Sequence, residues 1–113
     1  MSTYYFLVLS NPAEGREDEF NTWYDKEHVE DVLAVEGFTA AQRYRLAALG
    51  PGQDEPAYRY AAIFEAEADD VDIVQQNLMA ALTTGTTRRS DAIAPGSLAT
   101  WFEPIGERRT AST

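Results

Sequence analysis

Residues 16–38 read REDEFNTWYDKEHVEDVLAVEGF, and this stretch decides the fold class. Its apolar residues recur at helical spacing, which is typical of an amphipathic helix packed against a sheet. The apolar stripe consists of Phe20, Trp23, Tyr24, Val32 and Val35. Carboxylates at Glu17, Asp18 and Glu19 occupy the expected first turn, where they meet the positive end of the helix macrodipole. Gly37 is a suitable stop signal, so the sequence predicts a helix between Arg16 and Gly37.

Four segments of strand length surround this helix and a second one. The strands are expected at residues 1–9, 38–46, 58–67 and 98–102, and the second helix at residues 71–82. The first strand is a continuous apolar run, which indicates a central place in a sheet. Residues 48–56 are expected to form a loop between the second and third strands, and residues 83–95 a flexible surface segment.

The resulting order is βαββαβ. Two βαβ halves of this kind build an α+β, ferredoxin-like sandwich, in which one four-stranded antiparallel sheet carries both helices on a single face. We expect one domain over residues 1–105 and a flexible C-terminal tail over residues 106–113.

Both faces of the expected sheet are apolar. The first strand offers Tyr5, Leu7 and Leu9 on one face and Tyr4, Phe6 and Val8 on the other. Two helices can cover only one face, so the other needs a second subunit. The sequence therefore predicts a homodimer that packs sheet to sheet.

The composition of the chain excludes several classes of partner and of chemistry. Nine Lys and Arg against nineteen Asp and Glu give a net charge of −10, which disfavours nucleic acid and anionic membrane surfaces as partners. No apolar run approaches the roughly 18 residues that a membrane span needs, and the N-terminus lacks the basic start of a signal peptide. Cysteine is absent, so thiolate chemistry and disulfides are excluded and the cytoplasm is the expected compartment.

A resemblance to a known superfamily is carried by residues 20–33 (FNTWYDKEHVEDVL), 35–38 (VEGF) and 41–44 (AQRY). An aromatic–Tyr–x–x–x–His pattern on the first helix and a Gly–aromatic pair at the second strand resemble the dimeric α+β barrel superfamily, in particular EthD-like and muconolactone-isomerase-like proteins. The resemblance implies a barrel of two sheets with one pocket per subunit between sheet and helices. Members include isomerases, dehalogenases, polyketide cyclases, cofactor-independent monooxygenases and haem-degrading enzymes, so it implies the place of the pocket better than its chemistry.

His28 and Tyr24 are the candidate catalytic residues. His28 is the only histidine, and its spacing from Phe20, Tyr24 and Val32 points the imidazole toward the sheet. An unperturbed pKa of about 6.5 suits proton transfer near neutral pH, and Tyr24, one turn earlier, could donate its phenol to a substrate oxygen. Asp25 and Asp31, each three residues from His28, could orient the ring. The alternatives are a core-edge histidine bonded to a carbonyl or carboxylate and a tyrosine that only fills the interface.

Four further residues are predicted to bind substrate. They are Asn11, Trp23, Arg43 and Tyr60. The guanidinium of Arg43 would hold a carboxylate or a developing enolate, because its fork matches planar oxyanions. Asn11 is also a good turn residue, and Trp23 also suits a core or dimer anchor.

The strand arginines have an alternative role in ion pairs. Arg43, Arg45 and Arg59 could pair with Glu65, Glu67 or Glu103 across strands or between subunits. Asp25 is expected to point outward as part of a solvated acidic face.

No cofactor and no metal are expected. One histidine without cysteine cannot supply a zinc site, and EF-hand, GxGxxG, Walker-type and GxSxG patterns are absent. The sequence favours a cofactor-independent acid–base enzyme, of the isomerase, lyase, dehydratase or cyclase type, that acts on a small hydrophobic carbonyl- or phenol-bearing metabolite. The alternatives are a cofactor-independent monooxygenase of phenols and a non-catalytic dimer that binds a small molecule.

Overall fold

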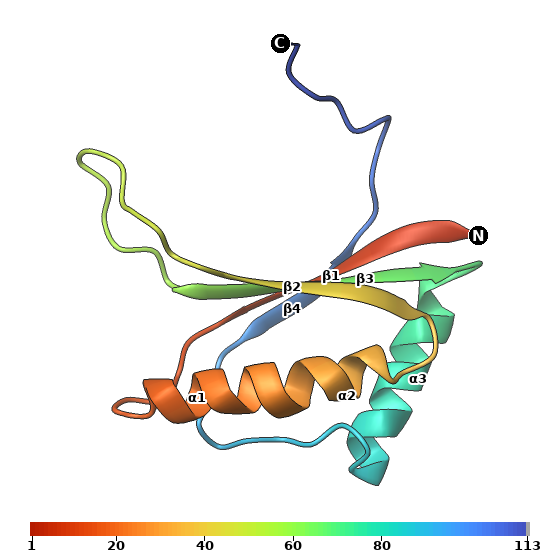
Figure 1. Ribbon diagram of the computed structural model, residues 1–113, viewed down its shortest axis with the longest axis horizontal. Coiled ribbons are helices and arrows are strands. Elements are labelled where there is room, and N and C mark those ends of the chain that lie inside the picture. Colours follow the sequence, from red (N-terminus) through yellow and green to blue (C-terminus); the bar gives the residue numbers. More distant parts are fainter. Residues whose placement is uncertain (113) are drawn as a thin grey trace.

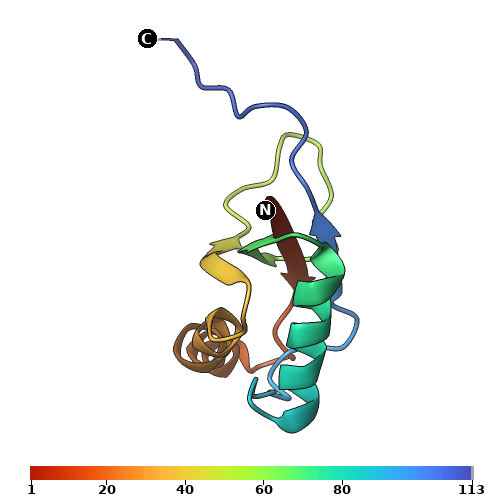
Figure 2. The ribbon, with the colours of Figure 1, turned by 90° about the vertical axis from the view of Figure 1, so that its right-hand side faces the viewer.

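The computed structural model describes residues 1–112 and shows one sheet with helices on one of its faces (Figures 1 and 2). In chain order the elements are β1 (Ser2–Ser10), α1 (Glu17–Trp23), η1 (Tyr24–His28), α2 (Val29–Leu33), β2 (Phe38–Arg45), β3 (Tyr60–Ala68), α3 (Val71–Thr84) and β4 (Leu98–Phe102). The strands pair antiparallel in the order β2-β3-β1-β4. The predicted ferredoxin-like βαββαβ fold is therefore confirmed.

The first helix is continuous but not uniform. α1, η1 and α2 follow one another without a break, and the residues at both junctions keep right-handed helical angles. η1 is a turn of π-helix, a rare insertion that is found often at functional sites. It lies where the sequence places Tyr24 and His28, so the local helix geometry bears directly on the candidate catalytic pair.

The core lies between the sheet and the helices. On β3, Ala62, Phe64 and Ala66 alternate toward the helices and are buried, as expected for a strand with one face in a core. Phe20 and Tyr24 from the first helix are also fully buried, which confirms the stripe read from the sequence. An aromatic side chain buried in this way contributes about 2–3 kcal/mol by removing apolar surface from water.

Gly37 brings the two helices close together. Its φ of +107° lies in the left-handed region, and a Cβ placed there would lie 2.9 Å from Cγ2 of Val74 on α3. Only glycine meets both conditions without strain. This close approach closes one end of the helical layer over the sheet.

The opposite face of the sheet is open and apolar. Tyr44 and Phe102 on this face are 50% and 55% exposed. Together with Tyr5, Leu7 and Ile63 they line a hollow of about 430 Å³, which we call the sheet-face hollow. The loop between β2 and β3 and the segment after β4 both project beyond this face (Figure 1).

The prediction of a surface segment at residues 83–95 is confirmed for most of its length, but two of its residues are buried. α3 continues to Thr84, and Thr87 and Ala92 are fully buried. The backbone of Ala13 donates to Ala92 at 2.6 Å, and Ile93 bridges Pro12. Tertiary contacts hold the end of the segment at Ala92 and Ile93, which its Thr, Arg and Gly composition did not indicate. Within residues 1–112, no helix is both long and apolar enough to span a bilayer.

Candidate functional site

Arg43 is the central charged residue of the candidate site. It lies on β2 with its side chain on the helix-facing side of the sheet, where it is only 17% exposed. Its Nη1 donates to Oδ1 of Asp25 and its Nη2 to Oδ1 of Asn21, both at 2.8 Å. Its Cζ lies 4.4 Å from the centroid of the Tyr24 ring, at cation–π distance. Three neighbours therefore fix the plane of the guanidinium.

A hollow opens beside this guanidinium, between the first helix and the end of β2. Its volume is about 460 Å³, within the size range of small-molecule pockets. We call it the Arg43 hollow, and its lining residues are Asn21, Asp25, Arg43, Tyr44, Arg45 and Tyr60. It lies between the sheet and the first helix.

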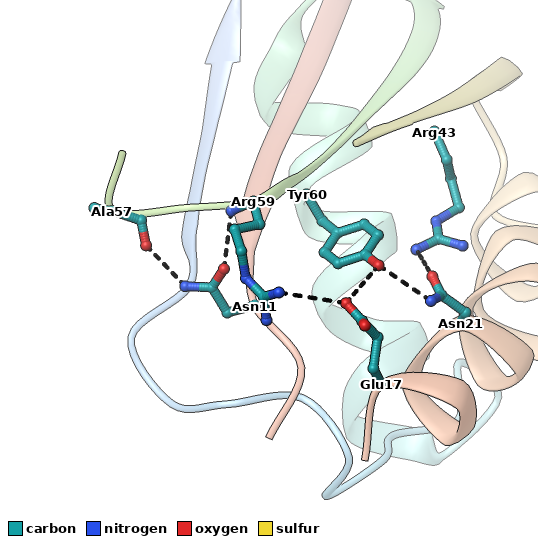
Figure 3. A network of polar contacts seen from close by, with 7 residues as sticks. All are labelled: Asn11, Glu17, Asn21, Arg43, Ala57, Arg59 and Tyr60. Atoms are coloured by element: carbon teal, nitrogen blue, oxygen red, sulfur yellow. Dashed lines mark hydrogen bonds and ion pairs between the residues drawn. The ribbon is translucent and has the colours of Figure 1, made fainter. Parts of the chain in front are cut away.

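A chain of polar contacts runs from Arg43 to the start of the helix (Figure 3). Asn21, which accepts from Arg43, donates its Nδ2 to the phenol oxygen of Tyr60 at 3.3 Å. Tyr60 in turn donates to Oε2 of Glu17 at 2.8 Å, and Arg59 meets the same carboxylate oxygen at 3.5 Å. The network holds the Tyr60 hydroxyl at the wall of the hollow.

Asn11 is placed as a loop anchor. Its Nδ2 donates to the carbonyl of Ala57 at 2.8 Å, and its Oδ1 accepts from the backbone N–H of Arg59 at 2.9 Å (Figure 3). Asn11 does not line the Arg43 hollow. It acts on the site by fixing the residues that precede Tyr60.

His28 lies behind the Arg43 hollow and is not among its lining residues. Its ring stacks on Trp23 at 4.6 Å and meets the edges of Tyr24 and Phe64 at 5.0 and 6.1 Å. Burial lowers the pKa of the imidazole to about 4, although the nearby carboxylate of Asp31 acts in the opposite direction. The ring is therefore neutral at pH 7. Its Nδ1 is buried and has no hydrogen-bond partner among the described residues.

Tyr24 contacts both the guanidinium of Arg43 and the imidazole of His28. Burial raises the pKa of its phenol to about 12, with the charge of Arg43 opposing that shift. The phenol therefore stays protonated at neutral pH. Trp23, also predicted to bind substrate, stacks on His28 and meets Tyr24 edge-on at 5.2 Å. It does not line the Arg43 hollow.

Several sequence expectations about charges were wrong. Arg43 pairs with Asp25 and Arg59 with Glu17, not with the strand or tail glutamates. Arg59 itself precedes β3 instead of lying on it. Asp25 is exposed as expected, with 63% of its side chain accessible, and its carboxylate also binds Arg43. Asp31 pairs with Arg88, whose hydrogen bonds hold the pKa of that carboxyl below its usual value.

The polar row that supports Arg43 was missed in the sequence. Glu17, Asn21 and Asp25 are spaced by four residues, so they share one ridge of the helix. Their spacing was visible, but the strand arginine that they meet could be assigned only after the helix was placed on the sheet. Across residues 1–112, no group of three or more His, Cys, Asp or Glu side chains is arranged to hold a metal ion.

No protein-family model matches the sequence, and no curated protein matches it either. Solved structures do match. An EthD-like protein from Ralstonia eutropha aligns with a TM-score of 0.61 and 16% identity over 96% of each chain. A DABB family protein with a ferredoxin-like fold from Mesorhizobium loti aligns with a TM-score of 0.59 and 18% identity over 94% of this chain and all of the other. An MhuD mutant with two manganese protoporphyrin IX molecules bound per active site aligns with a TM-score of 0.64 and 16% identity over 95% of this chain and 99% of the other.

These alignments cover nearly the whole chain, and they confirm the fold that the sequence motif implied. The chain has the ferredoxin-like fold that these solved structures share. At such low identity the likeness concerns the fold, so the chemistry has to be argued from the residues of the site.

Proposed function

We propose that this protein binds a small molecule with a planar oxyanion or carbonyl oxygen in the Arg43 hollow. The observation that carries the proposal is the fixed guanidinium at the wall of that hollow. Two of its N–H groups bind Asp25 and Asn21, which leaves other N–H groups of the fork for a ligand. A carboxylate, an enolate or a phenolate matches this geometry.

The surroundings of Arg43 favour recognition of a planar ring. Tyr60 gives the hollow an aromatic wall, and Asn21 adds an amide at its rim. The Tyr60 hydroxyl already donates to Glu17 and accepts from Asn21, so it is held in one orientation. A site whose polar groups are oriented before binding spends less free energy on ordering them.

Acid–base catalysis without a cofactor is a second candidate function, and His28 carries it. Its neutral ring has a buried Nδ1 without a partner, and a lowered pKa keeps the imidazole unprotonated at neutral pH. Such a group can take a proton next to a carbonyl, with Tyr24 or Arg43 near the developing oxyanion. Isomerisation, elimination and ring closure share this requirement, and nothing in the site distinguishes them. Oxygenation of a phenol and binding without turnover are the remaining alternatives.

We also infer that the protein is a homodimer that packs through its open sheet face. The sheet-face hollow and the exposed Tyr44 and Phe102 support this inference, because exposed apolar patches of this kind mark interaction sites. One structural neighbour, from Thermobifida fusca, is described as a dimeric ferredoxin-like protein.

Binding at the Arg43 hollow is tested by calorimetric titration with 4-hydroxybenzoate, which carries both a carboxylate and a phenol. We expect Arg43→Gln to weaken binding about tenfold or more, because a charge-assisted bidentate contact is lost. Arg43→Lys should recover only part of the affinity, since an ammonium lacks the planar fork. Arg108→Gln, an exposed change far along the chain, is the matched control for charge. Equal affinity in Arg43→Gln and in the unmodified protein would show that the hollow is not the site.

A further inference from the structure

Residues 85–91, which we call the strap, run from the end of α3 along the first helix. In Figure 1 the strap belongs to the light-blue segment that passes beneath α1. It starts at Gly85, whose φ of +81° ends α3. It finishes where Ala92 becomes buried and accepts a backbone hydrogen bond from Ala13. The strap is therefore a short segment between two fixed ends.

Charged side chains fasten the strap to the first helix. Arg88 donates to both carboxylate oxygens of Asp31 at 2.9 and 3.0 Å, and it meets Glu27 at 3.0 Å. Arg16 donates to the carbonyl of Asp91 at 3.0 Å and to its Oδ1 at 2.8 Å. The pairs with Glu27 and Asp91 lie at the surface, where water can replace them at small cost. The Asp31 side chain is only 13% exposed, so its pair with Arg88 is the main contact that holds the strap.

Three polar side-chain atoms on the strap and the first helix have no hydrogen-bond partner within residues 1–112. Nε1 of Trp23, Nδ1 of His28 and Oγ1 of Thr87 are all buried without a hydrogen-bond partner among the described residues. Trp23 is only 8% exposed, and Thr87 is fully buried. Each such atom loses its hydrogen bonds with water and gains none from the described residues. Two of them belong to side chains that stack on each other, Trp23 and His28, and the third precedes Arg88, which binds carboxylates on both sides of His28 in the helix. Buried polar atoms without a partner are uncommon in small domains.

A second hollow connects these two observations. It has a volume of about 650 Å³, and we call it the Trp23 hollow. The helix contributes Thr22, Trp23 and Glu27 to its wall, and the strap contributes Arg89, Ser90 and Asp91. Trp23 forms part of this hollow and also stacks on His28. Displacement of the strap would therefore widen the Trp23 hollow toward the imidazole.

We propose that the strap opens and that the space between it, Trp23 and His28 is a binding site for a small neutral molecule with a carbonyl oxygen and a hydroxyl group. The indole N–H of Trp23 can only donate, so it suits the carbonyl oxygen. The imidazole nitrogen of His28 and the hydroxyl of Thr87 can pair with the hydroxyl of the ligand. A bound molecule of this class satisfies the buried atoms that the closed strap leaves without partners.

This site is distinct from the Arg43 hollow in residues and in ligand class. The inference rests on the acid–base candidate in one respect: it names the route by which a substrate of such an enzyme would reach His28. Turnover depends on that candidate, whereas opening and binding do not. The experiments below measure opening and binding, so their failure is distinguishable from the absence of catalysis.

Opening is measured by the rate at which diethyl pyrocarbonate modifies the imidazole, followed at 240 nm. His28 is the only histidine, so the signal has one source. We expect slow modification in the unmodified protein and a rate about five- to tenfold higher in Arg88→Gln, which loses the charge-assisted hydrogen bonds to Asp31. Arg88→Lys should give an intermediate rate, because it keeps the charge but not the paired contact.

Two controls separate strap opening from unfolding. Arg108→Gln removes an equal charge away from the strap and should leave the rate unchanged, and circular dichroism should show the same folded spectrum for all variants. If Arg88→Gln is not folded, amide exchange of the unmodified protein gives the answer. The N–H groups of Thr87 and Arg88, which bind Ala81 and Asp31, should exchange faster than those of β3. Equal modification rates in folded variants, or strap amides as protected as β3, would overturn the proposal.

Binding is measured by NMR titration with 4-hydroxyacetophenone, a neutral compound with one carbonyl oxygen and one hydroxyl. We expect the indole N–H signal of Trp23 and the single imidazole signal to shift together, with larger shifts at equal concentration in Arg88→Gln. Trp101 provides an internal control, since its Nε1 already donates to Gln75 at 2.8 Å. Shifts confined to Trp101, or no shifts at millimolar concentration, would contradict the proposed site.

Discussion

The guanidinium of Arg43 lies 4.4 Å from the ring centroid of Tyr24, and the same ring meets His28 edge-on at 5.0 Å. One buried phenol ring therefore contacts both the cation of the Arg43 hollow and the imidazole behind it. The two candidate functional groups are coupled through Tyr24 by packing, and the π-helical turn between Tyr24 and His28 sets their relative position.

The role of the Tyr24 ring can be separated from that of its hydroxyl. Tyr24→Phe keeps the face on which Arg43 lies, so we expect the free energy of unfolding to fall by less than about 1 kcal/mol. Tyr24→Leu removes the aromatic face and leaves space around a buried position, and it should cost about 2–4 kcal/mol. Urea denaturation of both variants measures the difference. Equal losses would show that the cation–π contact contributes nothing.

The pKa of His28 links stability to pH. Burial lowers the pKa of the folded imidazole to about 4, against about 6.5 when unfolded. Between these values the unfolded chain binds more protons than the folded one, so stability rises with pH. The contribution of His28 to the free energy of unfolding is complete above pH 6.5 and is lost as the pH falls toward 4. Its upper value is about 3 kcal/mol.

His28→Gln removes this group, and the measurement is the difference in unfolding free energy between the unmodified protein and the variant. We expect the unmodified protein to lose stability relative to the variant as the pH falls from 7 to 4. NMR titration of the single imidazole gives the pKa directly. A midpoint near 6.5 would show that the ring is open to solvent in the folded state.

Gly37 should tolerate substitution less well than a glycine in open space. Gly37→Ala forces a side chain into the left-handed region and against Val74 at 2.9 Å, so we expect a loss of about 2–3 kcal/mol. Gly52→Ala is the matched control, because its φ is also positive but no atom lies within 4 Å of the added carbon. Thermal denaturation compares the two. If both variants lose the same stability, the approach of the helices to each other does not depend on Gly37.

The open sheet face should hold the dimer together. Ile63→Lys places a charge in the sheet-face hollow, and we expect it to give a monomer at micromolar concentration because a buried unpaired charge is costly. Ile73→Lys, at an exposed position on α3, is the matched control and should stay dimeric. Sedimentation equilibrium measures both. A stable monomer for the unmodified protein would refute sheet-to-sheet packing.

The fold was predictable because its signals are local and repetitive. The stripe of Phe20, Tyr24 and Val32 and the alternation of β3 each follow from one period along the chain, and the structure confirms them. The site was predictable only in part. Arg43 and Tyr60 meet at one hollow, whereas Asn11 serves a loop and His28 lies outside the lining. Neither the role of Asn11 nor the place of His28 outside the lining follows from spacing on a single element.

By itself, the sequence determined the helices, the strands, their order and the two apolar faces of the sheet, because hydrophobic periodicity fixes which side of each element must leave water. The tertiary structure alone decided which charges meet: Arg43 with Asp25, Arg59 with Glu17 and Arg88 with Asp31. The physical reason is that ion pairs join side chains from different elements at distances of a few ångströms. Such distances depend on how the helices are set on the sheet, and no pattern along a single element contains that information.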